Sequence, residues 1–261
     1  MDTGQLTRLF EQAPLFALIL ARIGTLVFAA PILGGGLVPG HVKALLSIAV
    51  SLILAPVLAA KHPTPIPLDL TYFVLITQEV MVGLAIGFVL TLFVEGIRMG
   101  GDLMNRYAGF SAAENFDPAT DLGNGPMGDL LYFAAVLMFL VTDGHHQLIA
   151  MMARSYDQVP IGTWSITAGY MSQIGAGMHQ LNVIAMALSA PVLSIVLAIT
   201  IVEGLMTRAV PQMNIMHVSF AVKIVLSLLV LWACLPMAVA FIGVVLAAMN
   251  QAGMAVLHTL H

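Results

Sequence analysis

The sequence predicts an all-α integral membrane protein with about six apolar helical segments, several of them kinked or broken. Hydrophobic residues make up 60% of the 261 residues and charged residues only 8%, and the mean hydropathy is +0.99. A soluble domain has roughly 25% charged residues. Nine Lys/Arg and thirteen Asp/Glu cannot cover a water-facing surface. Most of the outside must therefore face lipid or other apolar protein.

The first two apolar segments, 15–33 and 44–60, are predicted to form a helical hairpin. Each is close to the ~20 residues that cross a ~30 Å hydrocarbon core. Glycines at 34–36 and the Pro39-Gly40 pair indicate a short turn between them, and prolines at 63, 65 and 67 end the second segment.

The next two segments differ in length. The third, 70–97, is long and contains Glu79 and Glu95 among apolar residues. The fourth, 130–142, is too short to cross a membrane as a straight, independent helix.

The second half begins with a half-polar stretch, 143–182, which we expect to be a broken or interfacial helical region. Segments 183–202 and 224–249 carry no charge but contain Pro191 and Pro236. Proline removes a backbone donor, so a kink is expected in each.

The stretch 98–129 is the most unusual part of the chain. Together with Glu95 just before it, it contains six of the thirteen acidic residues. Its Gly100-Gly101 pair, Asp117-Pro118 and the run 123–126 are predicted to prevent a regular helix. An ordinary solvated loop is one interpretation. The other is a loop that lines or closes a passage, with Phe110 and Phe116 as its large apolar side chains.

Two features of the third segment suggest helix packing. Glu79 and Glu95 are sixteen residues apart, so on one helix they point about 160° apart. An intramembrane carboxylate can have an ion-coupling role. The diverging faces favour a structural pair, or a hydrogen bond to a neighbouring subunit. The spacing of Gly83 and Gly87 allows close approach of another helix.

No catalytic or metal-binding pattern is recognisable. His145 and His146 are adjacent, so on a helix they should project about 100° apart, which disfavours binding of one metal ion. No nucleophile elbow, phosphate loop or paired-carboxylate motif is present in the sequence. We expect neither an enzyme nor a cofactor-binding protein.

A specific motif follows the fifth apolar segment. Residues 204–215 read Gly-Leu-Met-Thr-Arg-Ala-Val-Pro-Gln-Met-Asn-Ile, so an Arg-Ala-x-Pro-Gln-x-Asn run is formed by Arg208, Pro211, Gln212 and Asn214. This run resembles the signature of the FliR family of flagellar type III export gate proteins, which is related to the SctT-type proteins of injectisomes.

Other stretches agree with this resemblance in order along nearly the whole chain. They are Arg22-Ile-Gly, Ala30-Pro31, Val38-Pro39, Pro56, Gln78-Glu79 with Gly83 and Gly87-Phe88, and Phe116-Asp117-Pro118. Gly144-His145-His146, Ser155-Tyr156 and Pro160-Ile161-Gly162 look flagellar rather than injectisome-like.

The resemblance implies a subunit of an export channel in the bacterial inner membrane, at the flagellar basal body, that is required for flagellum assembly. Its partners would be FliP and FliQ, with FlhB as a further partner, and exported flagellar proteins would pass through the channel. Residues 1–182 would be a FliP-like part and 183–261 a FliQ-like hairpin, together forming one integrated membrane domain.

The resemblance also implies a plug loop at 98–129. Within it we assign Gly109, Phe110, Phe116, Asp117 and Pro118 to the plug. The alternative function is a small ion-coupled secondary transporter that uses Glu79 or Glu95.

Overall fold

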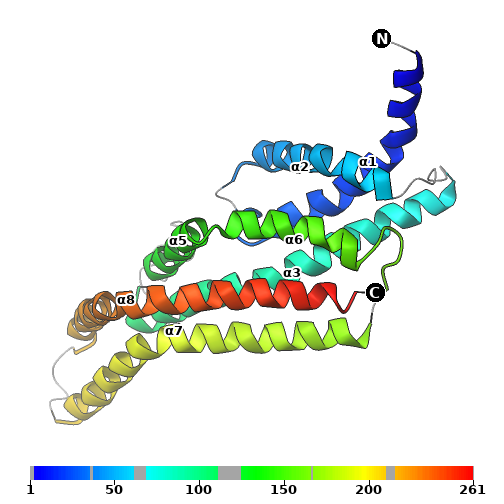
Figure 1. Cartoon of the computed structure of the whole chain (residues 1–261). Helices are drawn as coiled ribbons and strands as arrows, with labels where there is room; N and C mark the ends of the chain where they lie inside the picture. The colour runs from blue at the N-terminus through cyan, green and yellow to red at the C-terminus, as the bar shows by residue number, and fades with distance from the viewer. Residues whose placement is uncertain are drawn as a thin grey trace. The chain divides into compact units, whose positions relative to one another are not determined.

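The computed structural model describes residues 3–35, 38–61, 69–110, 125–165, 167–209 and 215–260, with the backbone alone for 3–12, 61 and 215–218. In these ranges all the regular structure is helical. The helices are α1 (Thr3–Ala29), α2 (Gly40–Lys61), α3 (Leu70–Ala108), α5 (Gly125–Val141), α6 (Gly144–Gln158), α7 (Ala168–Ala209) and α8 (Ile215–Leu257) (Figure 1).

Four of these helices are long and apolar enough to cross a membrane, over Gly40–Ala60, Leu70–Ala108, Ala168–Ala209 and Ser219–Leu257. A fifth span results if α5 and α6 form one span together. The most apolar stretch of α8 is only 22% buried within the chain, so most of that surface is left for lipid or for other proteins. The predicted all-α membrane fold is confirmed.

The chain divides into two compact units. Unit 1 consists of Met1–Leu92, Asp143–Gly177 and Ala248–His261, and unit 2 of Phe93–Thr142 and Met178–Ala247. Helices α3, α7 and α8 each contribute to both units. The predicted division into a FliP-like part, 1–182, and a FliQ-like hairpin, 183–261, is a different kind of division, based on likeness to other proteins. It stays a prediction.

The hairpin expected at the start of the chain is present in unit 1, where α1 and α2 pack against each other (Figure 1). Lys43 of α2 is buried and donates hydrogen bonds from Nζ to the carbonyl oxygens of Gly34 and Gly35, at 2.7 and 3.0 Å. These bonds satisfy carbonyls of the turn, where Ile32 adopts a positive φ of 69°.

Helix α3 is longer than the sequence suggested. It continues through Gly100 and Gly101 to Ala108, and α5 begins at Gly125, so both ends of the expected loop 98–129 are helical. A glycine costs a helix about 1 kcal/mol. Leaving backbone groups unpaired in apolar surroundings costs several kcal/mol each, so the helix persists. The expectation that these glycines interrupt the helix was wrong.

The half-polar stretch 143–182 contains α6 and the beginning of α7. The expected break in the helical region is the short connection 159–167 between α6 and α7. Residue 166 of this connection lies outside the described residues. Pro191 and Pro236 both lie inside continuous helices, α7 and α8.

Candidate functional site

A buried ion pair connects α1 to α3 in unit 1. The Nε atom of Arg22 lies 2.6 Å from Oε2 of Glu79, and Nη2 lies 3.0 Å from Oε1. Both side chains are only 1% exposed. The pair is bidentate, which is the strongest geometry for a guanidinium and a carboxylate.

The remaining polar atoms of this pair are bonded to the end of α6 and the residues after it. Arg22 Nη1 donates to the carbonyl oxygens of Ser155 at 3.1 Å and Val159 at 2.9 Å. The guanidinium carbon lies 4.2 Å from the ring centre of Tyr156. The backbone N–H of Gly162 donates to Glu79 Oε1 at 3.4 Å. Because its members come from α1, α3, α6 and the following connection, this network holds unit 1 together.

The sequence favoured a structural pair, or a hydrogen bond to a neighbouring subunit, for Glu79 but did not identify a partner. In the structure the partner is Arg22 of the same chain. The clue was present, because Arg22 is the only charge in the first apolar segment and an isolated ion in apolar surroundings is expensive. Glu95 has a different environment, on the same helix as Arg98 and 3.5 Å from it, with 46% of its side chain exposed.

Gly83 and Gly87 allow α3 to approach α1 of the same unit. A Cβ atom added to Gly83 would lie 2.5 Å from the carbonyl oxygen of Arg22 and would also meet the Thr25 side chain. A Cβ on Gly87 would lie 2.5 Å from that of Ala29. The close approach predicted from their spacing therefore takes place within the chain.

The end of α3 and the start of α5 are joined through Asn105 in unit 2. Asn105 is 4% exposed, and its Oδ1 accepts a hydrogen bond from the backbone N–H of Met127 at 3.0 Å. One turn earlier, a Cβ on Gly101 would collide with the backbone of Gly128, so the two helices touch there. The chain thus leaves α3 and returns to α5 at neighbouring points.

Two of the predicted plug residues, Gly109 and Phe110, lie at the end of α3, beside the contact with α5 made by Asn105; this region is called the base of the predicted plug. Gly109 has a φ of 93°, and the N–H of Phe110 donates to the carbonyl oxygen of Asn105 at 3.1 Å. This six-to-one bond with a left-handed glycine is a Schellman motif, which ends α3. Phe116, Asp117 and Pro118 lie outside the described residues. Asn105 was not identified from the sequence, because a single Asn in a helix carries no distinctive pattern.

The hairpin of α7 and α8 carries a second ion pair between helices. Lys223 Nζ lies 2.9 Å from Glu203 Oε2, and Ser219 donates to Oε1 of the same carboxylate. Arg208 is exposed near the end of α7, whereas Pro211, Gln212 and Asn214 lie outside the described residues. This pair was not identified from the sequence, although Glu203 is the only acidic residue after Asp157 and Lys223 is the last Lys or Arg.

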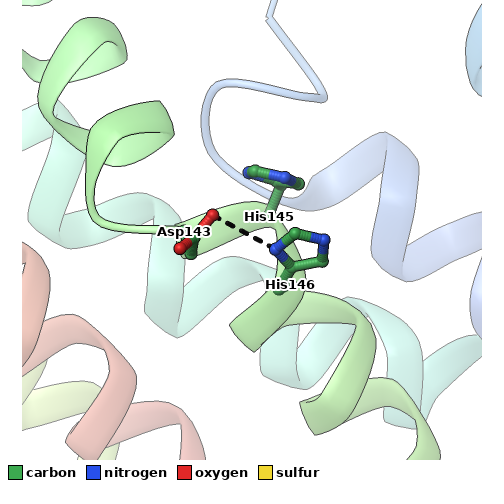
Figure 2. Close-up of side chains that lie close together, drawn as sticks. All are labelled: Asp143, His145 and His146. Carbon is green, nitrogen blue, oxygen red and sulfur yellow. Dashed lines mark hydrogen bonds and ion pairs between the residues drawn. The ribbon is translucent and has the colours of Figure 1, made fainter.

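Asp143, His145 and His146 form a cluster at the start of α6, in unit 1 (Figure 2). The two imidazole ring centres are 4.1 Å apart, and one potential ligand atom from each of the three residues lies within 4.8 Å of the others. The inference that adjacent histidines point too far apart to share an ion does not hold for this geometry.

Comparison with known proteins places the chain among bacterial export proteins. Residues 13–249 match the family model described as "Bacterial export proteins, family 1". The chain belongs to this family. The match covers both compact units, including the Arg22–Glu79 network and the α7–α8 hairpin.

Individual family members are distant but similar over most of their length. The flagellar biosynthetic protein FliR of Escherichia coli is 25% identical, over 85% of this chain and 84% of its own. FliR of Caulobacter vibrioides is 29% identical, over 81% and 84%. The surface presentation of antigens protein SpaR of Shigella flexneri is 24% identical, over 86% and 88%. The predicted resemblance to FliR is confirmed.

Proposed function

We propose that the chain is a subunit of the flagellar type III protein-export gate, which forms the export channel with FliP and FliQ and is required for flagellum assembly. The observation that carries this proposal is the family match over residues 13–249, together with relatives named as flagellar biosynthetic proteins. The membrane would be the bacterial inner membrane, at the flagellar basal body. FlhB would be a further partner, and the chain would have no catalytic activity of its own.

The exposed apolar helices support a subunit rather than a protein that acts alone. The described residues of α2 and α8 present large apolar side chains such as Leu45, Leu52, Trp232 and Val244, all more than 60% exposed. Lipid can cover part of such a surface, and helices of other subunits can cover the rest.

The alternative, an ion-coupled secondary transporter, receives less support from the geometry. Such a transporter needs an intramembrane carboxylate that can bind and release an ion. Both oxygens of Glu79 are bonded to Arg22, and the side chain is 1% exposed. Glu95 is half-exposed beside Arg98, on the same helix. These contacts favour structural roles for both carboxylates.

Co-expression tests the subunit proposal directly. The chain should be produced alone, and also together with FliP and FliQ from the same organism, and its native mass measured after purification in detergent. We expect low yield and heterogeneity alone, and a defined complex of all three proteins together. A stable, monodisperse monomer or homo-oligomer that never associates with FliP or FliQ would contradict the proposal.

Within the channel, residues 109–124 are proposed to form the plug, a narrower assignment than the 98–129 expected from the sequence. The support for this proposal lies in the described residues on either side of the segment. There Asn105 and the contact of Gly101 with Gly128 join α3 to α5, and the Schellman motif at Gly109 ends α3. Phe110 and Phe116 would supply an apolar constriction, which gates by excluding water, and Gly109, Asp117 and Pro118 are assigned to the same plug.

The motif of Arg208, Pro211, Gln212 and Asn214 is proposed to fix the hairpin of α7 and α8 and to contact FlhB. Proline ends a helix, and side-chain amides can satisfy backbone groups left free at the break. The ion pair of Glu203 and Lys223 supports this role, because it holds the two helices together on either side of the motif. Replacing Asn214 with Leu should lower complex yield and motility; wild-type values for both would contradict this role.

A further inference from the structure

In the cluster of Asp143, His145 and His146 at the start of α6, the aspartate does not cap the helix that follows it. Asp143 precedes the helix with φ 54° and ψ 31°, and its carboxylate makes no capping hydrogen bond to the backbone of α6. Instead, Oδ1 lies 3.2 Å from Nδ1 of His146 (Figure 2). The left-handed conformation therefore turns the carboxylate toward the imidazoles rather than toward the helix amides that an N-terminal Asp usually binds.

We propose that Asp143, His145 and His146 bind a divalent transition-metal ion, with Zn²⁺ and Ni²⁺ as the best-matched ions. Two imidazoles and one carboxylate are a donor set that such ions prefer, whereas Mg²⁺ and Ca²⁺ prefer oxygen ligands alone. All three residues offer a donor atom within a region 4.8 Å across.

Small side-chain rotations suffice to complete the geometry. Metal–donor distances of about 2.1 Å place donor atoms roughly 3.4 Å apart in a tetrahedral site. The side chains of His146 and Asp143 are 69% and 71% exposed, so they are free to rotate inward by this amount. Their exposure also leaves room for water to complete the coordination sphere.

The environment of His145 gives the proposal a second, separate support. Its Nδ1 atom is shielded from solvent and has no hydrogen-bond partner among the described residues. A buried polar atom without a partner is unfavourable. His145 thus retains unused hydrogen-bonding capacity, and its imidazole is available as a ligand.

The helix dipole opposes cation binding at the start of α6, and the negative charge of Asp143 offsets this effect. The first turn of α6 carries the positive end of the helix dipole, which disfavours a bound cation. The carboxylate of Asp143 is the negative charge nearest to this turn in sequence, and because it does not cap the helix it can neutralise the ion directly.

The test uses the full-length chain in detergent, with whatever partners co-purify, and an affinity tag that contains no histidine. Zn²⁺ and Ni²⁺ binding should be measured by calorimetry, and Co²⁺ binding by its visible absorption. We expect one ion per chain in the micromolar range or tighter. H146Q, H145Q and D143N should each weaken binding by at least about tenfold. Acidification should release the ion, because imidazole must be neutral to coordinate.

Matched controls separate this site from other histidines. His179, on α7, and His258, just after the end of α8, are exposed histidines outside the cluster, so H179Q and H258Q should bind the ion as the wild type does. H146Q changes an exposed side chain, and an unchanged melting temperature without metal would show that it folds normally. The absence of stoichiometric binding in the wild type, or equal binding by an H145Q/H146Q double variant, would overturn the proposal. Failure of this test would leave assembly with FliP and FliQ unaffected.

Discussion

Unit 1 and unit 2 each contain an ion pair between two helices, but the two pairs lie in different surroundings. Arg22 and Glu79 are 1% exposed, and the guanidinium also binds two backbone carbonyls. Glu203 and Lys223 are 19% and 18% exposed and bind one further hydroxyl. The fully enclosed pair is held in a network that bonds all its polar groups, whereas the partly exposed pair has fewer partners.

The largest effect is expected from breaking the buried pair. Replacing Glu79 with Ala leaves the Arg22 guanidinium buried and uncompensated, which typically costs about 3–5 kcal/mol. The variant should lose most of its thermal stability in detergent and accumulate at low levels in the membrane. Melting temperature and membrane abundance measure this directly.

Glu95 provides the matched control on the same helix. Its carboxylate is 46% exposed, so E95Q should change the free energy of unfolding by less than about 0.5 kcal/mol. Equal destabilisation by E79A and E95Q would refute the contrast between a fully bonded buried carboxylate and a half-exposed one.

A smaller effect is expected from adding a methyl group between α1 and α3. G83A places a Cβ atom 2.5 Å from the backbone oxygen of Arg22, and such overpacking typically costs about 1–3 kcal/mol. In G24A, on α1, the new atom meets nothing within 4 Å, and the helix should gain stability by up to about 1 kcal/mol. The predicted sign therefore differs between the two variants. Thermal melting that shows the same sign for both would contradict the described packing of α3 on α1.

A smaller loss than in E79A is expected at the pair in unit 2. E203Q removes the charge but keeps an acceptor for Ser219, so the free energy of unfolding should fall by only about 0.5–1.5 kcal/mol. A loss as large as that in E79A would remove the distinction drawn between the two units.

The sequence predicted much of the fold because the signals are local and strong. Apolar runs marked the helices, and the glycines and prolines at 34–40 marked the first hairpin. The length of α3 was underestimated because glycine is only a weak helix breaker when the surroundings are apolar and neighbouring helices pack on it. Gly101 shows this plainly, since it lies inside α3 against Gly128 of α5.

The contacts were harder to predict than the helices. Glu79 was recognised among apolar residues, but pairing it with Arg22, so far away in sequence, requires knowing how the helices pack. Asn105 and the pair of Glu203 and Lys223 likewise depend on which helices are neighbours. The geometry at His146 depends on the left-handed conformation of Asp143, which periodicity does not reveal.

The central claim, that this chain helps to form and close an export channel, is tested most directly by the conductance of membranes that contain altered plug segments. Residues 111–116 should be replaced by a Gly/Ser sequence of equal length, which retains Phe110 and the base around Asn105. A second variant, N105A, removes the hydrogen bond to Met127 and loosens the base itself. A Gly/Ser replacement of residues 62–67 serves as the control.

Complex abundance must be measured alongside conductance for each variant. The proposed channel predicts normal assembly with FliP and FliQ, a large leak of ions and small solutes in the 111–116 variant, a smaller leak in N105A, and none in the control. An assembled complex with altered 111–116 that conducts no more than the wild type would contradict the account.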